Sequence, residues 1–287
     1  MKDKVLFHLT ASGFYTAFCL ASVSVSTQII VSQKEPEIHY SAFLFFISFL
    51  YYNVHKIIWF GHQRMGDKSN LKYRWPAQNP ALLLLCLVVA FAGSISLLNL
   101  CINSFPKLIA ITVAFTVALC YNAPLNMMPL RSVKGIKAFA IALVIIITGM
   151  IIPSMDDFLF INNNYTSYAL YLGAQLIFIA SLCIAGDIRD IREDRDDKIK
   201  TFPVITGQHF SKIISSLLLI CHATVMFLLW QIEALQLNQY ELFLVIDLIG
   251  IMLISRLKET DHYYYFIMMI DGLILLQAIG LLLIERI

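Results

Sequence analysis

Residues 80–101 read PALLLLCLVVAFAGSISLLNLC, a stretch without a charged side chain that is long enough to cross a lipid bilayer as a helix. The rest of the chain shares this character. Of its 287 residues, 59% are hydrophobic and only 14% are charged, whereas about 25% of a soluble domain is charged. A soluble fold could not cover this much apolar surface with a polar skin. We therefore expect an integral membrane protein.

Eight further apolar runs lie on either side of this stretch. Because lipid offers the backbone no hydrogen-bond partners, and because the runs are too long for barrel strands, they are predicted to be helices. We expect one all-α polytopic membrane domain, residues 1–287, folded as a bundle of nine transmembrane helices. The predicted spans cover about residues 5–32, 39–59, 80–101, 106–121, 134–153, 166–187, 209–231, 239–256 and 262–284.

The positive charges indicate the orientation of the bundle. With nine spans, the N-terminus and the four loops on its side of the membrane hold, with their flanks, 18 of the 21 lysines and arginines. Such an excess marks the cytoplasmic side. We expect a multi-pass protein of a bacterial inner (plasma) membrane whose N-terminus is cytoplasmic. The net charge of +2 is too small to predict a nucleic-acid partner.

The loop after the sixth span, residues 187–200, contains most of the side chains that could bind a metal ion or a phosphate group. Asp187, Asp190 and Asp194 are spaced i, i+3 and i+7, so a helix continuing from the membrane would bring the three carboxylates to one face. Oxygen ligands of this kind suit Mg²⁺, which typically bridges one or two carboxylates to substrate phosphates. Lys200 and the nearby arginines could contact phosphate directly. The alternative is a solvated charged loop that anchors a helix to the headgroups.

Two segments together resemble the UbiA superfamily of membrane prenyltransferases. The loop matches the family's second aspartate motif, D-x-x-D-x-x-x-D followed by K-T-x-P-V-x-x-G. The matching residues are Asp187, Asp190, Asp194, Lys200, Thr201, Pro203, Val204 and Gly207. The segment that begins at Tyr121 and reads YNAPL, followed by Arg131, is similar to the family's Y-x-x-P-L segment between spans four and five.

This resemblance implies a reaction and a set of site residues. Family members use Mg²⁺ to ionise a polyprenyl diphosphate and join the prenyl group to a lipophilic acceptor, usually aromatic, inside the membrane. Besides membrane lipid, the expected partners are therefore a polyprenyl diphosphate and that acceptor. The resemblance assigns catalysis and Mg²⁺ binding to Asp187, Asp190 and Asp194. It assigns substrate binding to Asn53, Tyr121, Arg131 and Lys200.

The chain departs from the family pattern where a first aspartate motif, N-D-x-x-D-x-x-x-D, is expected. Asn53 is kept, but Val54, Ile57 and Gly61 replace the three aspartates. A transferase could compensate with other residues, because a cation neutralises phosphate without any carboxylate. The candidates for this compensation are His55, Lys56, His62, Arg64 and Asp67.

Two other functions stay open beside this transferase. A non-catalytic relative could bind a prenyl lipid without the chemistry. A transporter is disfavoured because the sequence lacks paired, interrupted helices in two halves.

Two carboxylates, Asp247 and Asp271, fall in the middle of the eighth and ninth predicted spans. A carboxylate at that depth is costly and needs a partner or a proton. The possible partners in neighbouring spans are His222, Gln175 and Gln277. Interhelical hydrogen bonding is the favoured interpretation, and a polar patch beside the acceptor is the alternative.

Overall fold

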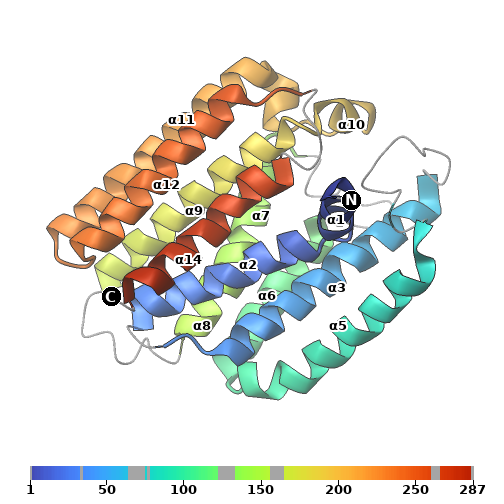
Figure 1. Cartoon of the computed structure of the whole chain (residues 1–287), viewed down its shortest axis with the longest axis horizontal. Coiled ribbons are helices and arrows are strands. Elements are labelled where there is room, and N and C mark those ends of the chain that lie inside the picture. Colours follow the sequence, from blue (N-terminus) through green and yellow to red (C-terminus); the bar gives the residue numbers. More distant parts are fainter. Residues whose placement is uncertain are drawn as a thin grey trace.

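The protein is a bundle of helices that run side by side (Figure 1). The computed structural model describes residues 2–32, 35–63, 75, 78–121, 133–155, 165–259 and 266–285. Every regular element in these ranges is helical, as predicted. In order they are α1 (Lys2–Ala11), α2 (Phe14–Thr27), η1 (Gln28–Ser32), α3 (Ile38–Gln63), α5 (Pro80–Cys101), α6 (Phe105–Tyr121), α7 (Ile136–Ile146), η3 (Ile147–Ile151), α8 (Ile152–Ser154), α9 (Tyr165–Asp187), α10 (Ile191–Asp196), α11 (Phe202–Gln231), α12 (Leu237–Arg256), η4 (Phe266–Asp271) and α14 (Gly272–Glu285).

Most predicted spans agree closely with these helices. The third span has the bounds of α5, and the fourth, sixth and eighth differ from α6, α9 and α12 by at most two residues at either end. The seventh span begins earlier than its predicted residue 209, because α11 starts at Phe202 with Pro203 in its first turn. A proline in that position has no backbone N–H to leave unpaired. Gly207 then interrupts the helix with φ 83° and ψ 163°.

The first predicted span, 5–32, is wrong as a single helix. The chain turns at Ser12 and Gly13, where Gly13 takes the left-handed φ of 84° that glycine adopts without strain. The Ser12 hydroxyl accepts a hydrogen bond from the Phe14 N–H at 3.2 Å as α2 begins. The membrane-length segment is therefore Phe14–Ser32, and α1 is a separate short helix.

The structure supports an integral membrane protein. Among the described residues, seven helical segments are long and apolar enough to cross a bilayer, and two shorter apolar helices, Ile38–Val54 and Phe105–Tyr121, lie at the second and fourth predicted spans. Large apolar side chains on α5 and α6 stand at the surface, among them Leu84, Phe91 and Phe105. Lipid is the medium in which such a surface is stable. The count of nine crossings stays a prediction.

The bundle is organised around α9, which packs against α7 and α11. Ser181 of α9 and Ser215 of α11 are both fully buried, and each hydroxyl donates to the other residue's carbonyl oxygen, at 2.8 and 2.7 Å. The remaining neighbours follow in turn: α11 with α12, α12 with α14, α14 with α2, α2 with α3 and α3 with α5. Figure 1 shows α10 and the N-terminus toward one end of the bundle and the C-terminus toward the other.

Candidate functional site

The aspartate segment lies where α9 ends, and it turns there. Asp187 is the last residue of α9, and the N–H groups of Ile188, Arg189 and Asp190 each bond to the carbonyl three residues earlier. α10 then starts at Ile191. The three aspartates therefore do not lie along one face of one continuous helix, as the spacing had suggested. The turn instead separates α10 from α9, and Asp187 and Asp194 both contact Lys137.

Asp187 and Asp194 converge on one ammonium group, that of Lys137 at the start of α7. The Lys137 Nζ lies 2.8 Å from Asp187 Oδ1 and 2.9 Å from Asp194 Oδ2. It also donates to Asp194 Oδ1 at 3.2 Å. All three residues are buried. We call Asp187, Asp194 and Lys137 the carboxylate–ammonium cluster.

The backbone fixes the lysine in this position. Gly135 has a positive φ of 71°, and its N–H bonds to the Lys200 carbonyl at 3.1 Å. This bond ties the start of α7 to the segment that follows α10. Because α7 also packs along α9, Lys137 is held between the end of α9 and the start of α10.

Asp190 forms a separate ion pair beside the cluster. Its two carboxylate oxygens accept from Nε and one terminal nitrogen of Arg189, at 2.7 and 3.0 Å. Such two-pronged pairing is the geometry that guanidinium and carboxylate groups favour. Among the described residues, no three histidine, cysteine or acidic side chains form a group that could hold a metal ion by itself.

Burial and charge act in opposite directions on Asp194. Burial raises the pKa of its carboxyl group above the ordinary value, because a charged carboxylate loses hydration there. The neighbouring Lys137 lowers the same pKa, and Asp190 raises it. The pKa of Asp194 is therefore raised overall, even though its partner is a cation.

The other predicted site residues are more scattered. Tyr121 ends α6 and lies within electrostatic reach of Lys137. Asn53 is fully buried in α3, where its Nδ2 donates to the Phe49 carbonyl at 2.9 Å and its Oδ1 has no hydrogen-bond partner among the described residues. The Lys200 side chain is exposed. Arg131 lies outside the described residues, and the side chains of His55, Lys56, His62, Arg64 and Asp67 do too.

Both intramembrane aspartates have partners. Asp247 of α12 pairs with His222 of α11, Oδ2 to Nδ1 at 2.7 Å, and both side chains are almost fully buried. His222 was one of the predicted candidates. Asp271 accepts instead from a residue that the sequence did not single out, Thr16 of α2, at 3.2 Å.

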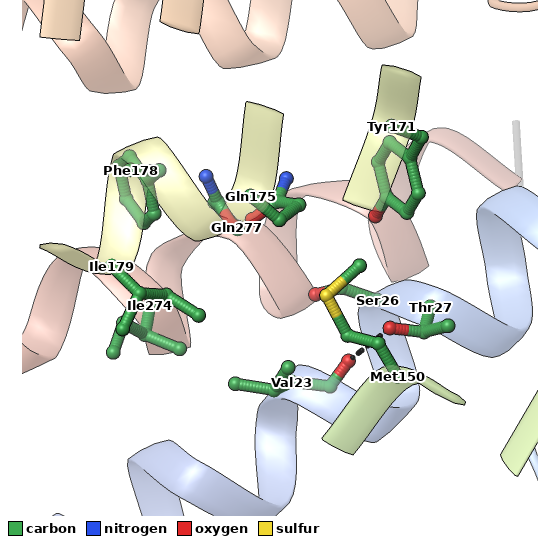
Figure 2. Close-up of a pocket in the computed structure, with 10 residues that line it drawn as sticks. All are labelled: Val23, Ser26, Thr27, Met150, Tyr171, Gln175, Phe178, Ile179, Ile274 and Gln277. Carbon is green, nitrogen blue, oxygen red and sulfur yellow. Dashed lines mark hydrogen bonds between the residues drawn. The ribbon is translucent and has the colours of Figure 1, made fainter. Parts of the chain in front are cut away.

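The remaining predicted candidates, Gln175 and Gln277, line a narrow internal cavity (Figure 2). The cavity has room for about one water molecule. Within the part of the chain that the structure describes, three buried polar atoms at its wall have no hydrogen-bond partner: Tyr171 Oη, Gln175 Nε2 and Gln277 Nε2. Gln175 lies twelve residues before Asp187, about 18 Å along α9 at 1.5 Å per residue. The cavity is therefore separate from the carboxylate–ammonium cluster.

The long apolar helices define an integral membrane protein. The chain belongs to the UbiA prenyltransferase family, whose model matches residues 77–265. This match includes Tyr121 and the whole aspartate segment, and it begins after Asn53 and the altered first motif. A comparison with curated protein sequences gives no significant match.

Two solved structures share the fold. One is the apo structure of a UbiA homolog from Aeropyrum pernix K1, which is 14% identical with a TM-score of 0.61, covering 95% of this chain and 98% of that one. The other comes from a study of digeranylgeranylglyceryl phosphate synthase in membranes; it is 16% identical with a TM-score of 0.53, covering 98% and 99%. At these identities the likeness concerns the fold.

Proposed function

We propose that this protein transfers a polyprenyl group from a polyprenyl diphosphate to a lipophilic, aromatic acceptor within the membrane. The observation that carries the proposal is the convergence of Asp187 and Asp194 on Lys137 at the end of a membrane-spanning helix. This segment resembles the second aspartate motif of the UbiA prenyltransferase family, and it lies within the residues that the family model matches. The diphosphate would bind at this end of the bundle, and the prenyl chain would extend among the apolar helices.

The residues present fit a magnesium ion at this position. Asp187 and Asp194 supply hard carboxylate oxygens that already converge on one cation. Mg²⁺ commonly takes only one or two protein carboxylates and completes its shell with water and substrate phosphates. Asp187 and Asp194 would hold it, and Asp190, which is beside them in the same segment, would complete the set of carboxylates. When bound, the ion would neutralise charge that develops on the departing diphosphate.

Cationic side chains of the protein would also neutralise part of the charge on the departing diphosphate. Lys137 and Arg189 are both held by carboxylates at the end of α9, and both can donate to phosphate oxygens. A cation in place of a metal compensates for the aspartates that the first motif lacks. The apolar bundle would keep water away from the allylic cation.

The same proposal assigns the cluster to the cytoplasmic face of a bacterial inner membrane. Its basis is the excess of Lys and Arg on that side of the predicted spans. Attachment of a membrane-impermeant thiol reagent to a cysteine introduced at Asp196, in intact cells and in inverted vesicles and relative to the protein with its six native cysteines alone, would test this orientation. Labelling only in inverted vesicles is the expected result, and labelling of intact cells would contradict it.

The function is tested by following diphosphate release from labelled geranylgeranyl diphosphate by the detergent-purified protein. The assay contains Mg²⁺ and either 4-hydroxybenzoate or a total lipid extract as acceptor. Asp190→Ala is the informative variant, because Asp190 lies outside the cluster and its loss leaves the Lys137 ion pairs in place. Asp196→Ala is the matched control, since Asp196 is exposed in the same segment.

We expect Asp190→Ala to lower Mg²⁺-dependent release by about 100-fold, the typical cost of removing one charge-stabilising group from a site. Asp196→Ala should retain the wild-type rate. Saturable binding of the diphosphate without release would favour a non-catalytic lipid-binding relative. Equal rates in the two variants would refute the proposed role of the segment.

A further inference from the structure

Asp271 is a carboxylate inside the membrane that the proposed diphosphate site does not use. It ends η4, a short π-helical segment, just before α14 begins at Gly272. Wide turns of this kind occur frequently at functional sites. Asp271 as a whole residue is intermediate in exposure, and it lies within the segment Phe266–Glu285 that is long enough to cross a membrane.

The neighbouring helix α2 fixes the position of this carboxylate. The Tyr15 hydroxyl donates to the Met268 carbonyl at 3.2 Å, and the Thr16 hydroxyl donates to Asp271 Oδ2 at 3.2 Å. Gly272 permits this approach, because a Cβ atom there would lie 2.7 Å from Tyr15 Oη. Two consecutive residues of α2 thus hold the end of η4 in place.

Arg189 connects Asp271 to the aspartate segment. Its guanidinium group pairs with Asp190 at 2.7 Å, lies 6.0 Å from the ring centre of Phe266 at the start of η4, and is within electrostatic reach of Asp271. η4 packs against α9, which carries Asp187. Asp271 therefore lies on the part of the bundle, formed by η4, that faces the aspartate segment.

Cys183 of α9 has both Asp187 and Asp271 in its neighbourhood. This thiol is one helical turn before Asp187 on α9, about 6 Å along the axis. Asp187, Asp271 and Lys137 all act on it electrostatically. An acceptor that meets the prenyl group just below the diphosphate would thus lie beside Asp271.

The other intramembrane carboxylate offers a direct contrast. Asp247 is almost fully buried, and its 2.7 Å contact with His222 is short. That pair joins α11 to α12, and interhelical bonding accounts for it. Asp271 has a longer bond from a neutral hydroxyl and keeps accessible surface.

We propose that Asp271 accepts the proton that the acceptor loses when it is prenylated, an inference that rests on the proposed function. The bond between the allylic carbon and the diphosphate oxygen breaks, and its electron pair leaves with the diphosphate. The acceptor forms the new bond to that carbon, and its proton passes to the Asp271 carboxylate and then to solvent. Without this base, the allylic cation is captured by water and released as the prenyl alcohol.

The test compares Asp271→Asn with Asp247→Asn in the assay described above, using labelled geranylgeranyl diphosphate with 4-hydroxybenzoate or the lipid extract. Asparagine is isosteric and still accepts the Thr16 hydrogen bond, so the helix contact is preserved. Two quantities are measured: the rate of diphosphate release, and the ratio of prenylated acceptor to prenyl alcohol. A thermal unfolding scan in detergent checks that each variant is folded.

We expect Asp271→Asn to lower acceptor prenylation by about 100-fold, within the usual contribution of a general base. Diphosphate release should fall less, so the share of prenyl alcohol should rise. If Asp271→Asn does not fold, Thr16→Val keeps the carboxylate but removes the hydrogen bond that orients it, and the same shift in product ratio is expected.

An unchanged product ratio in the folded variant, equal to that of Asp247→Asn, would overturn the role of Asp271 while the proposed function stands. A wild-type protein that releases no diphosphate would overturn the proposed function itself. The two failures are therefore distinguishable.

Discussion

Replacing Lys137 by methionine removes the cation on which Asp187 and Asp194 converge. The two carboxylate oxygens lie 2.8 and 2.9 Å from the same nitrogen, so they are at most about 5.7 Å apart. Two unit charges at that separation repel by about 3 kcal/mol at an effective dielectric constant of about 20. Removing one partner from a buried ion pair typically costs about 3–5 kcal/mol. We expect Lys137→Met to lower the free energy of unfolding by about 3 kcal/mol.

Protonation of a carboxylate will limit this loss and make it depend on pH. The pKa of Asp194 is already raised by burial, and Lys137 is a group that lowers it. Without the lysine, the pKa rises further above its value in the unfolded chain. A raised carboxyl pKa favours the folded state at low pH, and this stability is lost as the pH rises through the folded-state pKa. The loss of unfolding free energy in Lys137→Met should therefore be larger at pH 8 than at pH 5.

The measurement is reversible unfolding by SDS in mixed micelles, followed by tryptophan fluorescence. Lys134→Met is the matched control, because Lys134 is exposed and only three residues away. The double variant Lys137→Met/Asp194→Asn should recover about half of the loss, since the repulsion disappears with one charge. If Lys137→Met costs no more than Lys134→Met, the cluster does not stabilise the fold and the reasoning is wrong.

Two further predictions use the same unfolding measurement. A Cβ atom at Gly250 would lie 2.8 Å from Leu219 Cδ1 in the core, so Gly250→Ala should cost about 1–3 kcal/mol. At Gly173 no atom lies within 4 Å of an added Cβ atom, so Gly173→Ala should leave the free energy of unfolding unchanged or raise it slightly. Equal losses of stability in Gly250→Ala and Gly173→Ala would contradict the close packing at Gly250. His222→Ala leaves Asp247 without its buried partner and should cost about 3 kcal/mol, whereas His222→Phe/Asp247→Leu should cost less than half of that. A larger loss in the double variant would show that the pair itself is strongly stabilising.

The sequence predicts the helices well because lipid demands long apolar runs. An uncharged run such as residues 80–101 has few other interpretations, and its predicted ends agree with α5. His222 was found as a candidate partner of Asp247 for a similar reason, because few polar groups lie at that depth. The break at Gly13 was missed because both flanking segments are apolar, although a Ser-Gly pair at 12–13 was the available signal.

The arrangement of the site was harder to predict. The spacing of Asp187, Asp190 and Asp194 fits a continuous helix, and it fits a helix that turns and restarts equally well. Lys137 lies 50 residues before Asp187 in the sequence and looked like one of many cations near the cytoplasmic side. One signal in the sequence could have identified Lys137. Unlike Lys134, it lies inside the start of an apolar helix, where a cation needs a partner.

The adjacency of α2 and α14 bears on how the bundle is made in the cell. Ribosomes deliver a chain from its N-terminus, so α2 enters the bilayer well before α14, against which it finally packs (Figure 1). Until then Tyr15 and Thr16 lack the partners that Met268 and Asp271 provide. Insertion of the last described helix thus places α14 between α12 and α2 and brings Asp271 near the aspartate segment in one event. A nascent chain stopped before residue 266 would contain every residue of the carboxylate–ammonium cluster and still lack η4 and Asp271.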